Sequence, residues 1–164
     1  MASAGLLFSM ITSCSEPKDR EQRPNFIFIM ADDHANRTIS AYDGSINQTP
    51  NIDRLAKEGA IFTQSFNANS ICAPSRASIL TGKHSHRNGV TGNGAPWNNE
   101  QFTFPGALKE SGYETILMGK WHLNSLPGSG FEYYKVLTGA GNQGFYYNPE
   151  FNVNGKDTVT EKGY

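Results

Sequence analysis

A near-continuous apolar run at residues 25–31 constrains the fold of this chain most strongly. It reads Asn-Phe-Ile-Phe-Ile-Met-Ala and lacks the apolar/polar alternation of a half-exposed strand. Runs of this kind are typical of central parallel strands that are covered on both faces. The run leads directly into Asp32, Asp33 and His34. Because open α/β sheets bind ligands beyond the carboxyl ends of their strands, we expect this charged cluster at a ligand site.

Strand and helix signals alternate along the rest of the first 120 residues. Thr49 and Pro50 are typical of a helix start, and Gly59 of a helix end. This order predicts an α/β fold with a parallel sheet and helices on its faces. The region after Leu123 is rich in Gly, Asn and Tyr and is expected to be mostly loop, with a short hairpin around Asn154-Gly155. The expected elements are strand 25–31, helix 50–58, strand 60–66, a helix that begins at or just after Cys72 and ends at Gly82, helix 104–111 and strand 113–118.

Length and composition exclude several classes of protein. The chain has 164 residues, long enough for one core that buries about 70% of the unfolded surface. Its net charge of −1 gives no basic footprint for nucleic acid. Two cysteines exclude a disulfide framework and a four-cysteine zinc site. A bridge from Cys14 to Cys72 would consume the cysteine of greatest interest.

The N-terminus is typical of an export signal. Residues 4–11 form an apolar run of signal-peptide size that is too short to span a bilayer. Residues 11–14, Ile-Thr-Ser-Cys, resemble a bacterial lipobox, which implies a lipid anchor at Cys14 and a periplasmic or outer-membrane lipoprotein. No Lys or Arg precedes Cys14, so the usual basic region is missing. An ordinary cleaved signal or a disordered tail is the alternative.

Cys72 lies at the start of a predicted helix. Pro74 suits the first turn, and Gly82 suits the end. Amide groups at a helix start favour negative charge, and Arg76 lies four residues on, on the same face. The stretch therefore predicts an oxyanion site, with a buried structural cysteine as the alternative.

Two motifs resemble the signatures of type I sulfatases. The first is Cys-Ala-Pro-Ser-Arg at residues 72–76, followed by Leu-Thr-Gly at residues 80–82. The second is residues 112–122, a Gly-Tyr strand that ends in Gly-Lys-Trp-His. The resemblance implies an alkaline-phosphatase-like α/β/α sandwich with a mainly parallel central sheet, incomplete in this chain. It divides the chain into a leader and tether, residues 1–23, and the N-terminal part of a catalytic domain, residues 24–164.

The resemblance also implies a modified nucleophile and a metal. Cys72 is expected to be oxidised to formylglycine by a maturation enzyme that reads the Cys-x-Pro-x-Arg stretch before folding hides it. Asp32, Asp33 and position 72 are expected to bind a catalytic calcium ion. Two adjacent carboxylates by themselves favour a hard cation, calcium or magnesium, although a solvated acidic turn is the alternative.

Lys120 and His122 complete the expected catalytic set. Alternate residues of an extended chain point to one side, so both would face the site while Trp121 packs away from it. The positive charges of Lys120 and Arg76 would stabilise a sulfate ester in its transition state, and a histidine can move a proton near neutral pH. A Lys-x-His pair without the surrounding motif would be an ordinary surface strand end.

Several further residues are candidates with a plain structural alternative. His34 is either a support for the aspartates or a core residue. The loop histidines are substrate contacts or solvated side chains, and the aromatic residues stack on sugars or anchor loops. The loop histidines are His84 and His86, and the aromatic residues are Trp97, Tyr133, Tyr146 and Tyr147.

The substrate expectation rests on finer resemblance. Residues 31–35, 39–42, 69–72 and 82–89 look most like N-acetylglucosamine-6-sulfatases, which implies a 6-O-sulfated N-acetylglucosamine of a glycosaminoglycan such as heparan sulfate. Family members are considerably longer and take further ligands from downstream segments, so we expect little sulfatase activity from this chain alone. A phosphoesterase of the same superfamily and an inactive glycan-binding fragment are the alternatives.

Overall fold

The computed structural model describes residues 23–160, 162 and 163, with the side chains of residues 157–159 left out. The expected leader, including Cys14, lies almost wholly outside the described residues. The chain forms two units that meet in sequence between Asp33 and His34. In the part of the chain that the structure describes, no helix is long and apolar enough to cross a membrane.

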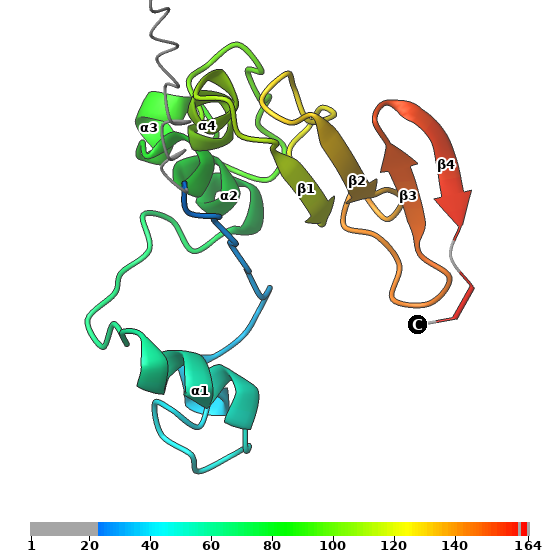
Figure 1. The fold of residues 1–164 in the computed structure, drawn as a ribbon. Coiled ribbons are helices and arrows are strands. Elements are labelled where there is room, and N and C mark those ends of the chain that lie inside the picture. Colours follow the sequence, from blue (N-terminus) through cyan, green and yellow to red (C-terminus); the bar gives the residue numbers. More distant parts are fainter. Residues whose placement is uncertain (1–22, 161, 164) are drawn as a thin grey trace, which may run out of the picture. The chain divides into compact units, whose positions relative to one another are not determined.

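Residues 23–33, in the first unit, are an irregular segment, and the prediction of a strand at 25–31 is wrong for this structure (Figure 1). The side chains from Phe26 to Ile29 are between 63% and 86% exposed. A strand needs a neighbouring strand to satisfy its backbone N–H and C=O groups. Within its own described unit, this segment has no such neighbour.

Five helices are described in the second unit, and most follow local signals. α2 begins at Cys72 and ends before Gly82, whose left-handed φ of 66° suits the position after a helix. α4 begins after Thr103, whose hydroxyl accepts a hydrogen bond from the amide of Gly106 as an N-cap. The helices are η1 (Asn36–Thr38, 3₁₀), α1 (Pro50–Glu58), α2 (Cys72–Thr81), α3 (Ser85–Asn88) and α4 (Phe104–Glu110).

Polar side chains, and not apolar contacts, hold the start of α1. The Asp53 carboxylate accepts hydrogen bonds from the hydroxyls of Ser40 and Thr49, and the Ser40 bond is the main cause of the lowered pKa of Asp53. Ile52 and Leu55, the large apolar residues of α1, are 42% and 61% exposed. The polar contacts therefore fix the start of α1.

The predicted strand at residues 60–66 is also wrong for this structure. No strand is assigned there, and Phe62 and Phe66 are 74% and 87% exposed. As with residues 25–31, the apolar pattern is suited to a strand, but the described residues provide no neighbouring strand. β-structure depends on such pairing more than on intrinsic preference.

The described sheet contains four strands in the order β1-β2-β3-β4 (Figure 1). β1 and β2 are parallel, with Ile116 opposite Tyr133, and the other two pairs are antiparallel. The α/β prediction is confirmed, but this sheet is mixed rather than mainly parallel, because the chain reverses through residues 138–149 between β2 and β3 and through a tight turn between β3 and β4. The strands are β1 (Ile116–Gly119), β2 (Tyr133–Leu137), β3 (Glu150–Val153) and β4 (Lys156–Thr160).

The turn between β3 and β4 is the one expected at Asn154-Gly155. Both residues have positive φ, 50° and 74°, as a two-residue type I′ hairpin turn requires. β2, in contrast, lies in a region that was expected to be loop. Its five residues become a strand through pairing with β1 on one side and β3 on the other.

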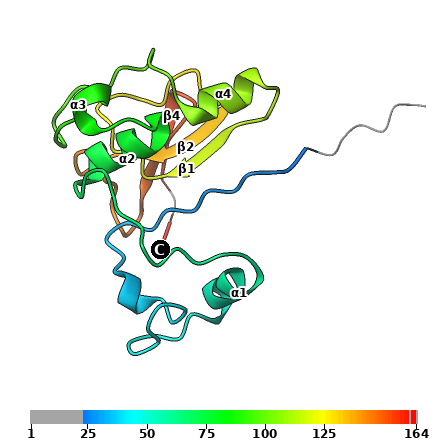
Figure 2. The ribbon, with the colours of Figure 1, turned by 90° about the vertical axis from the view of Figure 1, so that its left-hand side faces the viewer.

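A hydrophobic core joins α2 to the region around β1 and β2. The Trp121 ring meets the rings of Trp97 and Phe131 edge-on, with centroids 5.9 and 6.0 Å apart. Figure 2 shows β1 and β2 side by side from a second direction. One core thus supports both the helix that carries Cys72 and the chain that follows β1. The buried hydrophobic residues are Ala73, Ala77, Val90, Trp97, Trp121, Leu123, Tyr134 and Val136.

Candidate active site

Cys72 is the first residue of α2 and is half-buried, with its thiol outside any disulfide. The cap position before it, Ile71, has no polar side chain to satisfy the first amides of the helix. Two asparagines take this role. Asn69 Oδ1 accepts from the Ile71 amide at 3.0 Å, and Asn93 Oδ1 accepts from the Ala73 amide at 3.1 Å. The backbone on both sides of Cys72 is therefore fixed.

The loop that supplies Asn93 is itself braced. Asn124 Nδ2 donates to the backbone oxygens of Asn93 and Ala95, at 2.9 and 2.8 Å. Asn124 lies in the segment between β1 and β2, so this segment positions the loop that caps α2.

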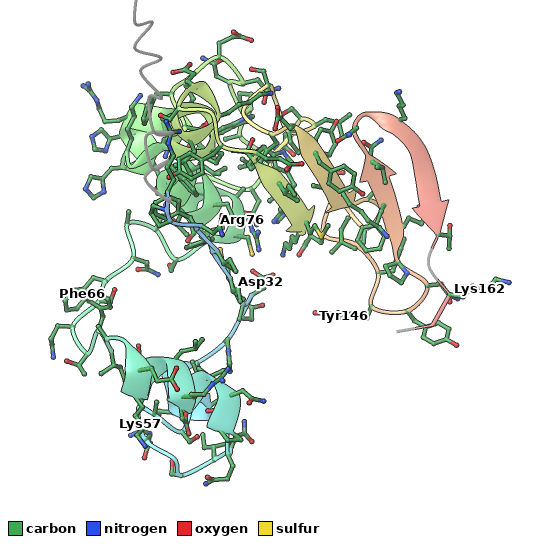
Figure 3. The ribbon with its side chains drawn as sticks, in the orientation of Figure 1. Asp32, Lys57, Phe66, Arg76, Tyr146 and Lys162 are labelled. Carbon is green, nitrogen blue, oxygen red and sulfur yellow. The ribbon has the colours of Figure 1, made fainter. Side chains whose placement is uncertain are left out.

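Arg76 lies on α2, one turn beyond Cys72 (Figure 3). Its Nη1 donates a 2.6 Å hydrogen bond to the backbone oxygen of Lys120. The contact joins α2 to the residue directly after β1. Besides supplying positive charge, as the sequence predicts, Arg76 thus holds two parts of the site together.

Lys120 brings its ammonium to Cys72, as the two motifs predict. Lys120 Nζ is 3.7 Å from Cys72 Sγ and 3.4 Å from Gln143 Oε1. Gly119, with φ of 100°, turns the chain at the end of β1 just before Lys120. The Lys120 ammonium, the start of α2 and the Cys72 sulfur therefore meet in one place.

The residues after Lys120 do not continue the extended alternation. Trp121 is 5% exposed and packs into the core, as predicted. His122 is also 5% exposed, and its backbone is left-handed, with φ of 52°. The positive φ values at Gly119 and His122 interrupt the geometry on which the pairing of Lys120 with His122 was based, and the catalytic role of His122 stays a prediction.

Asp32 and Asp33 are exposed and belong to the first unit, whereas Cys72, Arg76 and Lys120 belong to the second. Their carboxylates are the donors that a hard cation prefers, and Asp33 has an unusual φ of 50°. Within the described ranges, no three His, Cys, Asp or Glu side chains gather to hold a metal. The two aspartates therefore fit part of a calcium or magnesium site, and their grouping with position 72 stays a prediction.

The remaining candidates divide between exposed and buried positions. Trp97 is a core residue, in agreement with the structural alternative. His84 and His86 are exposed, and their rings stack at 6.0 Å. Tyr146 and Tyr147 are 88% and 66% exposed. The other two candidates, His34 and Tyr133, are exposed and half-buried, respectively.

Four residues at the site escaped the sequence analysis: Asn69, Asn93, Asn124 and Gln143. All are amides in loops, and each acts through a contact that only the folded chain creates. Their loop composition does not identify which amide makes a contact.

The chain is similar to several known proteins. The family model described as Sulfatase matches residues 24–162. The chain is 48% identical to an N-acetylglucosamine-6-O-sulfatase of Bacteroides thetaiotaomicron, a match that covers 94% of this chain and 27% of that protein. It is 37% identical to Arylsulfatase G of Homo sapiens, over 91% of this chain and 30% of that protein.

Solved structures show the same similarity. The structure of BT4656 in complex with its substrate D-glucosamine-2-N,6-O-disulfate matches with a TM-score of 0.84 and 49% identity, over 87% of this chain and 28% of that one. The structure of Ps i-CgsB matches with a TM-score of 0.62 and 29% identity, over 71% of this chain and 32% of that one. The chain thus spans about a third or less of the length of these relatives.

Proposed function

Because this chain belongs to the sulfatase family, we propose that it serves in the hydrolysis of sulfate esters of sugars, with residue 72 as the nucleophile. The observation that carries this proposal is the contact of Lys120 Nζ with Cys72 Sγ at 3.7 Å, at the start of α2. The Cys72 sulfur occupies the position from which the formylglycine oxygen would act.

The chain's own groups suit a sulfate ester. The oxygens of a sulfate ester carry negative charge, which repels a nucleophile. Further negative charge develops on the leaving oxygen as the ester bond breaks. The Lys120 ammonium would bind a sulfate oxygen beside position 72 and stabilise that charge. The hydrogen bond from Arg76 to the backbone oxygen of Lys120 joins the end of β1 to α2. This bond therefore fixes the position of the Lys120 ammonium relative to residue 72.

Formylglycine at position 72 would supply an aldehyde whose hydrate has one hydroxyl to attack sulfur and a second whose deprotonation would release sulfate, a release that the thiol cannot provide. A formylglycine-generating enzyme is therefore the proposed maturation partner. Asp32 and Asp33 would hold calcium, with magnesium as the alternative, and the cation would add positive charge near the sulfate. The support is the chemistry of the two carboxylates.

The proposed substrate is a sulfated carbohydrate that carries 6-O-sulfated glucosamine, as in a glycosaminoglycan. Two relatives support it: the 48% identical N-acetylglucosamine-6-O-sulfatase and the structure bound to D-glucosamine-2-N,6-O-disulfate. We further propose export to the periplasm or outer membrane with a lipid on Cys14. The support for export is the apolar run at residues 4–11 and the lipobox-like residues 11–14.

Peptide mass measurement across Cys72 tests the proposal most directly. After co-expression with a formylglycine-generating enzyme, the peptide should show the mass loss of thiol-to-aldehyde conversion, and Cys72→Ser should show none. Release of sulfate from 6-O-sulfated N-acetylglucosamine would then be compared with hydrolysis of the matching phosphate monoester. An unmodified Cys72, or a preference for the phosphate ester, would contradict a sulfatase.

A further inference from the structure

Gln143 contacts the same ammonium as Cys72. Lys120 Nζ donates to Gln143 Oε1 at 3.4 Å, while the same nitrogen is 3.7 Å from Cys72 Sγ. Gln143 lies between β2 and β3, on a segment separate from both α2 and the end of β1. A third part of the chain thus contacts Lys120 beside Cys72.

The loop that carries Gln143 has a specific conformation. Gly139 and Gly144 both have positive φ, 76° and 84°, and the Gly144 amide donates to the Gly139 oxygen at 3.3 Å. A Cβ on Gly139 would lie 2.5 Å from the Phe145 ring, and one on Gly144 would lie 2.9 Å from Leu137. Neither position accepts a larger residue without a shift, so close packing on both sides of Gln143 defines the path of the loop.

The Nε2 group of the Gln143 amide has no acceptor among the described residues. A glutamine carries one oxygen acceptor and two N–H donors. The oxygen accepts from Lys120, whereas no contact to an acceptor is found for Nε2 among residues 23–160. The side chain is exposed, so these donors are available to a bound molecule next to Lys120.

We propose that Gln143 is a substrate-recognition residue, which uses its oxygen to orient the Lys120 ammonium and its N–H groups to bind a sulfate oxygen or the adjacent sugar hydroxyl. The inference rests on the proposed function and names a residue for the same site. A neutral amide suits this place, because a carboxylate would hold Lys120 equally well but would repel an anionic substrate.

Gln143→Leu tests the role, with Gln101→Leu as the matched control. Gln101 also makes one amide hydrogen bond, in which its Nε2 donates to the Asn88 backbone oxygen at 3.4 Å, but it has no contact with Lys120 or Cys72 among those described. The first readout is calorimetric binding of inorganic sulfate to the protein with unmodified Cys72. The second is KM and kcat for 6-O-sulfated N-acetylglucosamine after maturation.

Loss of a hydrogen bond to a charged ligand predicts a rise of about fivefold or more in the sulfate Kd and in KM for Gln143→Leu, with kcat changed by less than about twofold. Gln143→Glu should raise both values further, although it keeps an acceptor for Lys120. Gln101→Leu should leave both unchanged. A purely structural role would instead lower the melting temperature with no change in Kd.

The two proposals can fail separately. If Cys72 stays unmodified after co-expression with the maturation enzyme but sulfate binding still depends on Gln143, the proposed function fails and the recognition role stands. Wild-type sulfate affinity in Gln143→Leu, or no sulfate binding by the wild type, overturns the recognition role whatever the turnover.

Discussion

The Arg76 guanidinium donates a 2.6 Å hydrogen bond to the backbone oxygen of Lys120, and the Lys120 side chain in turn reaches Cys72. Two residues that are 44 positions apart in sequence thus fix the relation between α2 and the end of β1. The contact uses the backbone oxygen of Lys120, whereas its side chain contacts the Cys72 sulfur.

Replacement of Arg76 by methionine should lower the free energy of unfolding by about 2 kcal/mol, because a half-buried hydrogen bond from a charged donor is lost. Urea denaturation measures the change. Arg76→Lys should not restore it, since an ammonium lacks the planar geometry of the guanidinium. Arg87→Met, on the exposed face of α3, is the control and should stay within about 0.5 kcal/mol of the wild type. An equal effect at both positions would contradict this role.

Asn93→Ala should cost about 1 kcal/mol of stability, because the Ala73 amide at the start of α2 loses its acceptor. Asn93→Asp keeps an oxygen in the same place and should recover most of the loss. Chemical denaturation of the three proteins provides the comparison. If the aspartate variant is as unstable as the alanine variant, Asn93 does not act as a cap.

Trp121→Ala should lower the free energy of unfolding by about 4 kcal/mol, since it leaves a large cavity between Trp97 and Phe131. Thermal and urea unfolding both report it. Phe66→Ala serves as the control, because that ring is 87% exposed and its removal should cost less than about 0.5 kcal/mol. A large loss in the control would mean that Phe66 is covered in solution.

The start of α1 should loosen in acid. The hydrogen bond from Ser40 lowers the pKa of Asp53 below 3.8, so the folded state favours the charged carboxylate. The stabilisation is therefore present above pH 3.8 and is lost as the pH falls through the lower, folded-state pKa. Hydrogen-exchange protection of the Ser40 and Thr49 amides, whose acceptors are each other's hydroxyls, measures this. In Asp53→Asn the acid step should vanish, and its persistence would assign it to another group.

Local signals predicted local structure well. The end of α2 before Gly82, the start of α4 at Phe104 and the turn at Asn154-Gly155 follow from signals in neighbouring residues, and all three are confirmed. The contact between Cys72 and Lys120 was also predicted, because the two motifs assign both residues to one site.

Features that depend on distant pairing could not be predicted in the same way. The apolar runs at 25–31 and 60–66 have the composition of strands, but no strand is assigned at either run in the described structure. β2 became a strand because β1 and β3 flank it. The contact of Gln143 with Lys120 depends on how a loop turns between two strands, which no sequence pattern specifies.

The sheet connectivity has a consequence for the order of folding. β3 and β4 are joined by a two-residue turn, and hairpins of this kind close within about 1–10 μs. The contact between Cys72 and Lys120 instead closes a loop of 48 residues, which carries a larger entropic cost. We therefore expect the hairpin to form early and the contact of Lys120 with Cys72 to form late. During folding, the paired strands β3 and β4 should therefore be detectable before the candidate active site is assembled.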